Sequence, residues 1–481
     1  MSEKTFFGQP RQLVTIFGVE MWERFSFYGM QGILLLYMFY PVTQGGLGID
    51  EKVAAGIVGA YGGSVYLATI LGAWLADRLF GSERVLFFAA IMVMFGHIAL
   101  AVLPEYVGLA VGLICIAIGA GGVKSNSTSI VGQLYAPGDV RRDAGFSLYY
   151  LGINLGAFVG PIATGFLQTT EGFHWGFGLA AVGMAVGLTQ YTFGRRKLPD
   201  STRVVPNPLP HEKRLVIYIA AGVALVAIVA LIAMGVITAT TLSTFIIFVT
   251  LAATISYFVI MLTSKLITPI ERNRVFAFIP LFLATTMFWS LFQQQFTVVT
   301  LFANNQLNLT IGSWTMPVSW VQSINPIFVI ILSGVFAALW TKLGTRQPAA
   351  PSKFALANIV LGGAFLMFLL VYSAAPHSAP LLILVLILFT FTVAELLLSP
   401  VGLSLATKLA PGSFRTQMIA LFFLASALGT ALSGQLAVLY DSDNPSENFD
   451  YFLYLGSAAI LVGVLLFLFR KPILKLMEGV R

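Results

Sequence analysis

Residues 15–40 read TIFGVEMWERFSFYGMQGILLLYMFY, a long apolar segment that contains Glu20, Glu23 and Arg24. A helix that crosses a bilayer needs about 20 mostly apolar residues, so this segment is long enough. The three charged residues follow the spacing i, i+3, i+4, which places them on one helix face and lets Glu20 pair with Arg24. Ionised groups at this depth are costly unless they are paired or face water, and they usually mark a pathway. The segment therefore predicts a membrane helix with a functional charged face; the alternative is a static ion-pair cluster that only fixes helix packing.

The composition of the whole chain agrees with this interpretation. Of its 481 residues 58% are hydrophobic and only 10% are charged, and the mean hydropathy is +0.88. Soluble domains carry about 25% charged residues, so this chain has too much apolar surface for a water-soluble core. The polar first residues predict no removable signal peptide. These features predict an all-α membrane protein.

Hydropathy and helix breakers together predict fourteen spans, arranged as six, then two, then six. They lie near residues 15–40, 52–79, 84–103, 106–129, 141–166, 175–194, 214–237, 242–264, 273–303, 318–342, 353–373, 379–406, 414–438 and 449–470. We therefore expect an N-terminal six-helix bundle at 1–197, a linker with two inserted helices at 198–268 and a C-terminal six-helix bundle at 269–481. Transporters built from such repeats bind their substrate near the mid-plane of the membrane.

The basic residues give an independent test of this topology. With the N-terminus in the cytoplasm, all of the 27 Lys and Arg fall in cytoplasmic segments, Lys4 and Arg481 among them, except Lys52, Arg24 and Lys124. Cytoplasmic loops of membrane proteins are enriched in Lys and Arg, so the net charge of +7 acts as an orientation signal. Nucleic-acid binding is therefore not needed to explain it. We expect a multi-pass protein of the cell (inner) membrane with both termini in the cytoplasm.

Three further polar residues lie at mid-span depth. Lys124, in the fourth span, needs a carboxylate partner such as Glu20 or Glu23, unless it snorkels to the interface. Asn154 in the fifth span can bind a substrate carboxylate or amide, or equally join two helices. Glu395 is the one acidic residue at depth in the second half. A carboxylate opposite a basic cluster suits a zwitterion, with its amine at Glu395 and its carboxylate at Arg24 and Lys124.

Three separated motifs carry a resemblance to a known family. The pattern Glu20-x-x-Glu23-Arg24-Phe25-x-x-Tyr28-Gly29 closely resembles the ExxERFxYYG motif of proton-dependent oligopeptide transporters, which belong to the major facilitator superfamily. Residues 146–156 match that family's fifth-helix motif, which ends in I-N-x-G. Residues 72–81, GAWLADRLFG, resemble the superfamily loop between helices two and three. The resemblance covers essentially the whole chain and indicates a prokaryotic member with the major facilitator fold.

The resemblance implies a role for individual residues. The proton is handled by Glu20, Glu23 and Arg24 together with Lys124 and Glu395. The substrate is bound by Arg24, Tyr28, Gln31, Tyr66, Lys124, Asn154, Trp289, Gln293, Asn325, Glu395, Ser399 and Phe422. Asp77, Arg78 and Gly81 act as a conformational latch on the cytoplasmic side. Together they imply proton-coupled import of di- and tripeptides by alternating access.

The sequence departs from the family pattern at several positions. Phe27 replaces the first tyrosine of the first motif, and Phe422 stands where a tryptophan is usual. Gln31 and Gln293 occupy the positions at which many members carry an arginine and a carboxylate that pair across the extracellular gate. When both charges are replaced together, no buried charge is left without a partner. We therefore expect a gate closed by two amides rather than by an ion pair.

Other functions remain as alternatives at this point. Transport of another small anion or of a drug-like molecule would use the same fold, although a singly charged anion leaves Glu395 without a partner. An enzyme is disfavoured because His97, His174, His211 and His377 show no metal-ligand spacing and no nucleophile–base arrangement is recognisable. We expect no metal and no cofactor. Expected partners are small peptides, protons and the lipid bilayer, with no nucleic acid, and a monomer is expected.

Overall fold

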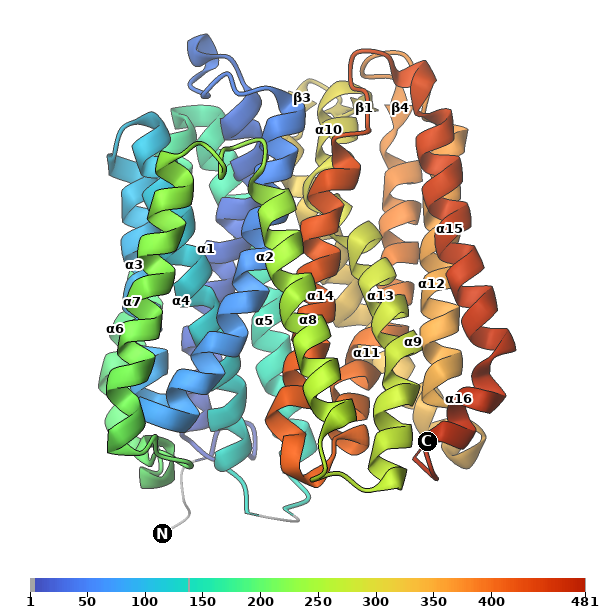
Figure 1. Ribbon diagram of the computed structural model, residues 1–481. Helices are drawn as coiled ribbons and strands as arrows, with labels where there is room; N and C mark the ends of the chain where they lie inside the picture. The colour runs from blue at the N-terminus through green and yellow to red at the C-terminus, as the bar shows by residue number, and fades with distance from the viewer. Residues whose placement is uncertain (1–4, 137–138, 481) are drawn as a thin grey trace. The chain divides into compact units, whose positions relative to one another are not determined.

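The computed structural model describes residues 5–136 and 139–480, and these are almost entirely helical (Figure 1). The long helices are α1 (Leu13–Phe39), α2 (Glu51–Leu75), α3 (Ser82–Val102), α4 (Glu105–Gln133), α5 (Arg142–Glu171), α6 (Phe173–Gly194), α7 (His211–Ala233), α8 (Leu242–Thr263), α9 (Pro269–Phe292), α11 (Ile324–Leu343), α12 (Ala350–Met367), α13 (Leu381–Leu409), α14 (Arg415–Ala437) and α15 (Asn448–Leu468). Two short helices are α10 (Val298–Asn305) and α16 (Arg470–Leu476). A backbone in hydrocarbon must satisfy its own hydrogen bonds, which explains this dominance of helix. Lys4 and Arg481, both predicted to be cytoplasmic, lie outside the described residues.

Each of the fourteen predicted spans coincides with one of the long helices. Twelve of these helices are long and apolar enough to cross a membrane. The other two are α1, which carries the three charged residues of the first motif, and α6. The all-α membrane fold is therefore confirmed, whereas the count of fourteen spans stays a prediction that depends on α1 and α6.

Two local features differ from the sequence-based expectation. The span expected near 273–303 is interrupted, because α9 ends at Phe292 and a 3₁₀ turn, Gln293–Phe296, precedes α10. The side chain of Gln322 donates hydrogen bonds to the Gln295 carbonyl at 2.6 Å and to Thr300 Oγ1 at 2.7 Å, which satisfies a backbone group at the break. Residues 72–81, which resemble a loop, are helical as far as Phe80, where a π-helical turn, Ala76–Phe80, follows α2. Gly81, with φ of +80°, ends the helix in a conformation that suits glycine.

Four two-residue strands, which the sequence did not predict, lie in loops of the second half. β1 (Leu307–Asn308) pairs in parallel with β4 (Ala379–Pro380), and β2 (Thr310–Ile311) pairs in antiparallel fashion with β3 (Trp314–Thr315).

The contacts divide the chain into two units. Unit 1 comprises Met1–Val53 and Ser64–Phe245, and unit 2 comprises Ala54–Gly63 and Ile246–Arg481. In unit 1, α1 packs along α5 and α6, and α3 packs along α4. In unit 2, α12 packs along α15 and α13, and α9 along α14. The predicted division into two bundles and an inserted pair stays a prediction. Of the inserted helices, α7 has no buried residue.

A buried ion pair fixes the start of the linker to α3 in unit 1. Glu83 is 1% exposed and accepts hydrogen bonds from Arg195, whose guanidinium lies 3.7 Å from the centroid of the Phe87 ring. Arg203 Nε lies 3.9 Å from the second oxygen of Glu83. A carboxylate without water is stabilised only by such partners. The linker is therefore held against the start of α3 by charge.

This arrangement predicts the effect of neutralising Glu83. In Glu83→Gln, Arg195 loses its carboxylate, and we expect a loss of about 2 kcal/mol, less than for a fully buried pair, because the Arg195 side chain stays 23% exposed. Thermal unfolding of the detergent-purified protein measures the effect. Asp200→Asn is the matched control, because Asp200 pairs with Arg203 at 3.0 Å but its own side chain is 96% exposed. Equal melting temperatures for the two variants would contradict the assigned role of Glu83.

Candidate functional site

The charged face of α1 forms a compact cluster in unit 1. Arg24 Nε lies 3.1 Å from Glu20 Oε1 and 2.8 Å from Glu23 Oε2. The side chains of Arg24, Glu20 and Glu23 are 6%, 1% and 0% exposed, respectively. The predicted pairing of Glu20 with Arg24 is confirmed. Because one guanidinium serves two carboxylates, the cluster has an excess of one negative charge that a proton can neutralise.

The I-N-x-G segment of α5 explains how another helix lies so close to this cluster. At Gly156 an added Cβ would clash with the Met21 carbonyl oxygen and come within 3.1 Å of Arg24 Cβ. At Gly160 it would clash with the Phe25 carbonyl oxygen. Only glycine allows this approach. The glycines of α5 therefore bring its backbone against the turn of α1 that carries Arg24.

Lys124 lies on α4 with its side chain directed at an aromatic ring. Its Nζ lies 4.2 Å from the centroid of the Tyr66 ring of α2, in a cation–π arrangement. The expected ion pair with Glu20 or Glu23 is not formed: within the part of the chain that the structure describes, no carboxylate reaches ion-pair distance of Lys124. Lys124 nevertheless interacts electrostatically with Glu20, Glu23 and Arg24. Arg24 already holds both carboxylates, so Lys124 is available to another anion.

Three further predicted residues of unit 1 lie on two helices, α1 and α5. Tyr28 is half-buried on α1, and Gln31 is 7% exposed with its Oε1 unbonded among the described residues. Asn154 donates to the Tyr150 carbonyl of its own helix at 2.9 Å, so in this structure it does not join α5 to a neighbour through that bond.

Asp77, Arg78 and Gly81 lie where the linker returns to unit 1. The backbone N–H groups of Asn207 and Leu209 donate to the carbonyls of Asp77 and Arg78, each at 3.0 Å. An added Cβ at Gly81 would lie 2.7 Å from the Arg203 carbonyl oxygen. The three predicted latch residues therefore contact the linker through their backbone.

In unit 2, Asn325 and Ser399 are the predicted residues that lie next to Glu395 of α13. Asn325, at the start of α11, donates from its Nδ2 to Glu395 Oε2 at 3.2 Å and to Thr392 Oγ1 at 2.9 Å. Ser399 lies one turn beyond Glu395, and its buried Oγ has no hydrogen-bond partner in the described part of the chain. Among those same residues no cation pairs with Glu395. The carboxylate is therefore oriented by an amide but not neutralised by a charge.

The two predicted aromatic residues of unit 2 lie on two other helices, α9 and α14. Trp289 of α9 lies against Gly429 of α14, where an added Cβ would be 2.7 Å from the Trp289 Cβ. Phe422 of α14 is 8% exposed and lies against Gly402 of α13. Gln293 is half-buried at the break after α9, and Gln294 beside it accepts a hydrogen bond from the Tyr451 hydroxyl. These residues lie in the same unit as Glu395, and their role as walls of a binding site stays a prediction.

Sequence reasoning missed a cluster of hydroxyl groups next to Lys124. Tyr149 Oη of α5 lies 2.8 Å from Ser127 Oγ and 3.3 Å from Thr128 Oγ1, both on α4. The hydroxyl run that follows Lys124 was visible in the sequence. Its pairing with Tyr149 was not, because it depends on how α4 and α5 pack.

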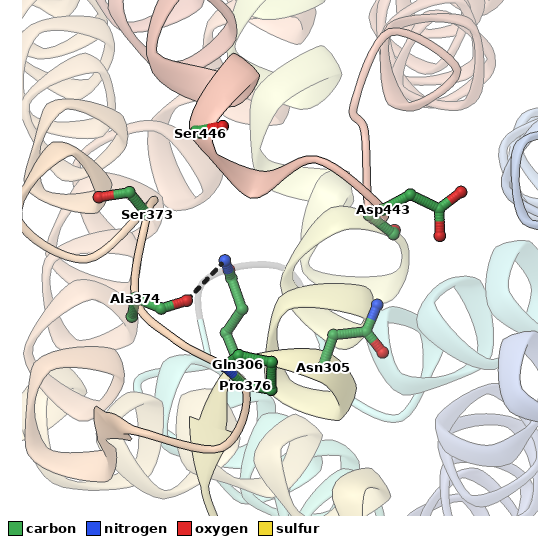
Figure 2. Close-up of a pocket in the computed structure, with 8 residues that line it drawn as sticks. Asn305, Gln306, Ser373, Ala374, Pro376, Asp443 and Ser446 are labelled. Carbon is green, nitrogen blue, oxygen red and sulfur yellow. Dashed lines mark hydrogen bonds between the residues drawn. The ribbon is translucent and has the colours of Figure 1, made fainter.

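A separate hollow of about 330 Å³ lies in the loops of unit 2 (Figure 2). It is lined by Asn305, Gln306, Ser373, Ala374, Pro376, Ser442, Asp443 and Ser446. Gln306 Nε2 donates to the Ala374 carbonyl across it at 3.4 Å. None of the predicted site residues lines this hollow. Across residues 5–136 and 139–480, no group of three or more His, Cys, Asp or Glu could hold a metal ion.

Comparison with known families settles the relationship that these motifs suggested. A family model described as the POT family matches residues 83–449. The chain belongs to the POT family. The predicted family membership is thereby confirmed, and the POT family consists of membrane transporters rather than enzymes.

Two bacterial relatives and one solved structure match this POT family member over almost its whole length. The uncharacterized transporter YclF of Bacillus subtilis (strain 168) is 41% identical, covering 99% of this chain and 97% of its own. The di-/tripeptide transporter of Lactococcus lactis subsp. cremoris is 39% identical, covering 100% and 99%. A crystal structure of a peptide transporter POT in complex with sulfate aligns with a TM-score of 0.94 at 42% identity, covering 99% of this chain and 98% of that one. The solved relative therefore shares its fold.

Proposed function

We propose that this chain is a proton-coupled importer of di- and tripeptides that works by alternating access. Its membership of the POT family and the di-/tripeptide transporter among its relatives support the substrate class. The observation that carries the proposal is the state of Lys124, a half-buried cation that lies over Tyr66 and has no carboxylate at ion-pair distance among the described residues. A cation at this depth needs an anion, and a peptide carboxylate is one.

The α1 cluster supplies the proton-binding groups. When a proton enters from outside, Glu23 or Glu20 becomes neutral and releases part of its hold on Arg24. Arg24 and Lys124 then share the peptide carboxylate, for which a guanidinium offers two parallel hydrogen bonds. Proton release to the cytoplasm restores both ion pairs of Arg24 and expels the peptide. The membrane potential contributes about 2.3 kcal/mol per charge per 100 mV.

The amino end of the peptide is assigned to Glu395. Its Oε2 accepts from Asn325 at 3.2 Å, which leaves the other oxygen for an ammonium group. Ser399 Oγ, unbonded within the described residues, is a second polar contact one turn away. Tyr28, Tyr66, Asn154, Trp289 and Phe422 are assigned to the walls of the site, and Gln31 and Gln293 to an uncharged extracellular gate. Protons are the coupling ion, no cofactor is required, and the working form is a monomer in the inner membrane.

Reconstitution tests the proposal directly. The purified protein is placed in liposomes with an imposed pH gradient, acidic outside, and uptake of labelled dialanine and trialanine is followed. We expect concentrative uptake that a protonophore abolishes. If no di- or tripeptide reduces uptake of the label, and nitrate or a cationic drug does reduce it, one of the alternative substrates is identified instead.

Glu395→Gln is expected to remove recognition of the peptide amine. A hydrogen bond to a charged group contributes about 1.5–3 kcal/mol, so dialanine should compete roughly 10-fold or more weakly. N-acetyl-dialanine, which lacks the ammonium group, should compete equally well in the variant and the wild type. Glu447→Gln, an exposed glutamate of unit 2, is the matched control. If the variant loses affinity for both ligands equally, Glu395 does not bind the amine.

The proposed orientation is tested with reporter fusions. We expect a reporter at Pro206, in the linker, to lie in the cytoplasm and one at Asn444 to lie outside, as the distribution of Lys and Arg predicts. An external location for Pro206 would mean that the number of spans before it is odd.

A further inference from the structure

The hydroxyl cluster between α4 and α5 joins the two helices beside Lys124. Ser127 Oγ and Thr128 Oγ1 lie 3.4 and 3.0 Å from the Lys124 carbonyl oxygen, to which each can donate. The Tyr149 Oη of α5 lies 2.8 Å from Ser127 Oγ and 3.3 Å from Thr128 Oγ1, and in each pair either hydroxyl can be the donor. In either direction the Tyr149 hydroxyl ties α5 to the turn of α4 that begins at Lys124.

Tyr149 can fix the position of α4 relative to α5. It is 1% exposed, so no water competes for its hydroxyl. The helix that carries it, α5, packs along α1 and contacts the Arg24 turn at Gly156. Tyr149 also interacts electrostatically with Glu20 and Arg24. The tyrosine therefore connects α5, which packs along the carboxylate-bearing helix α1, to the helix that holds Lys124.

We infer that Tyr149 is a positioning residue that sets the distance of Lys124 from the carboxylates of α1, an inference that rests on the proposed proton-coupled function. The charged groups facing Lys124 are Glu20, Glu23 and Arg24 of α1, and the titratable ring beside it is Tyr66 of α2. Without the Tyr149 hydroxyl, α4 is no longer tied to α5, and the field of Lys124 at Glu20 and Glu23 weakens. A carboxylate in a weaker positive field takes up its proton at higher pH.

The test compares two conservative substitutions. In Tyr149→Phe, we expect the midpoint of the pH profile of peptide uptake to move upward by about 0.5–1 pH unit, and the maximal rate to fall about threefold, as expected for one lost hydrogen bond. Tyr191→Phe is the control: Tyr191 is also buried, at 0% exposed, and its hydroxyl bonds the Glu83 carbonyl at 3.4 Å on a different pair of helices. A merely structural loss lowers the rate of either variant without moving the midpoint.

Two further measurements keep the inference separate from the proposed function. The melting temperature of the detergent-purified protein, followed against pH, needs no substrate; its pH dependence should shift in Tyr149→Phe and not in Tyr191→Phe. Ser127→Ala combined with Tyr149→Phe should shift the profile no further than the larger single shift, because both changes break the same bond. If the wild type takes up no peptide, the proposed function fails while the melting profile still decides the role of Tyr149. An unshifted melting profile in Tyr149→Phe, or additive shifts in the double variant, would overturn the inference.

Discussion

Replacing Arg24 with alanine is expected to abolish proton-driven uptake and also to destabilise the protein by about 3–5 kcal/mol, the usual cost of breaking a buried ion pair. Arg24 Nε lies 3.1 Å from Glu20 Oε1 and 2.8 Å from Glu23 Oε2, and both glutamates are at most 1% exposed. Without the guanidinium, two carboxylates lie together without water or a cation at ion-pair distance. Thermal unfolding and liposome uptake measure the two effects.

Two controls separate the charge of Arg24 from the bulk of its side chain. Arg84→Ala removes an exposed arginine from the same unit and should change neither quantity. Adding Glu23→Gln to Arg24→Ala removes one of the stranded charges and should recover part of the stability, but not the transport. If Arg24→Ala alone has the same melting temperature as the wild type, the two carboxylates are neutral in the resting protein.

Lys124→Ala should abolish gradient-driven uptake as completely as Arg24→Ala, but with little loss of stability. The reason lies in its contacts: Lys124 Nζ interacts with the Tyr66 ring at 4.2 Å, whereas both carboxylates keep their ion pairs with Arg24. Removing a desolvated cation that has no ion-pair partner also removes its desolvation cost. Exchange of peptide across the membrane without a gradient is expected to survive in part, because Arg24 remains.

The measurement is uptake with and without the pH gradient, next to thermal unfolding of the same preparation. Lys52→Ala, which removes an exposed lysine, should behave as the wild type in both assays. Concentrative uptake at the wild-type rate in Lys124→Ala would remove Lys124 from the proposed mechanism. A large drop in melting temperature would show that Lys124 stabilises the carboxylates directly.

Much of this protein follows from local features of the sequence. The positions of the helices are encoded in runs of apolar residues, because hydrocarbon leaves the backbone no partner except itself. The pairing of Glu20 with Arg24 is likewise local: residues four apart on a helix are neighbours whatever surrounds the helix. The place of Asn325 beside Glu395 was implied by the family resemblance, and the structure brings the two within 3.2 Å.

Other features depend on distances between helices, about which the spacing along one chain segment carries no information. From the sequence, Lys124 needed a carboxylate; in the structure Arg24 occupies both carboxylates and Lys124 lies over Tyr66. The break after Phe292 is stabilised by Gln322, and the turn at Lys124 is tied to Tyr149, partners 27 and 22 residues away from the groups they bond. Periodicity and charge thus determined which helices form and which of them carry charged groups at depth. Packing between helices decided the partners of groups on different helices, such as Lys124 over Tyr66, because a buried polar group interacts with whichever group the fold places nearest to it.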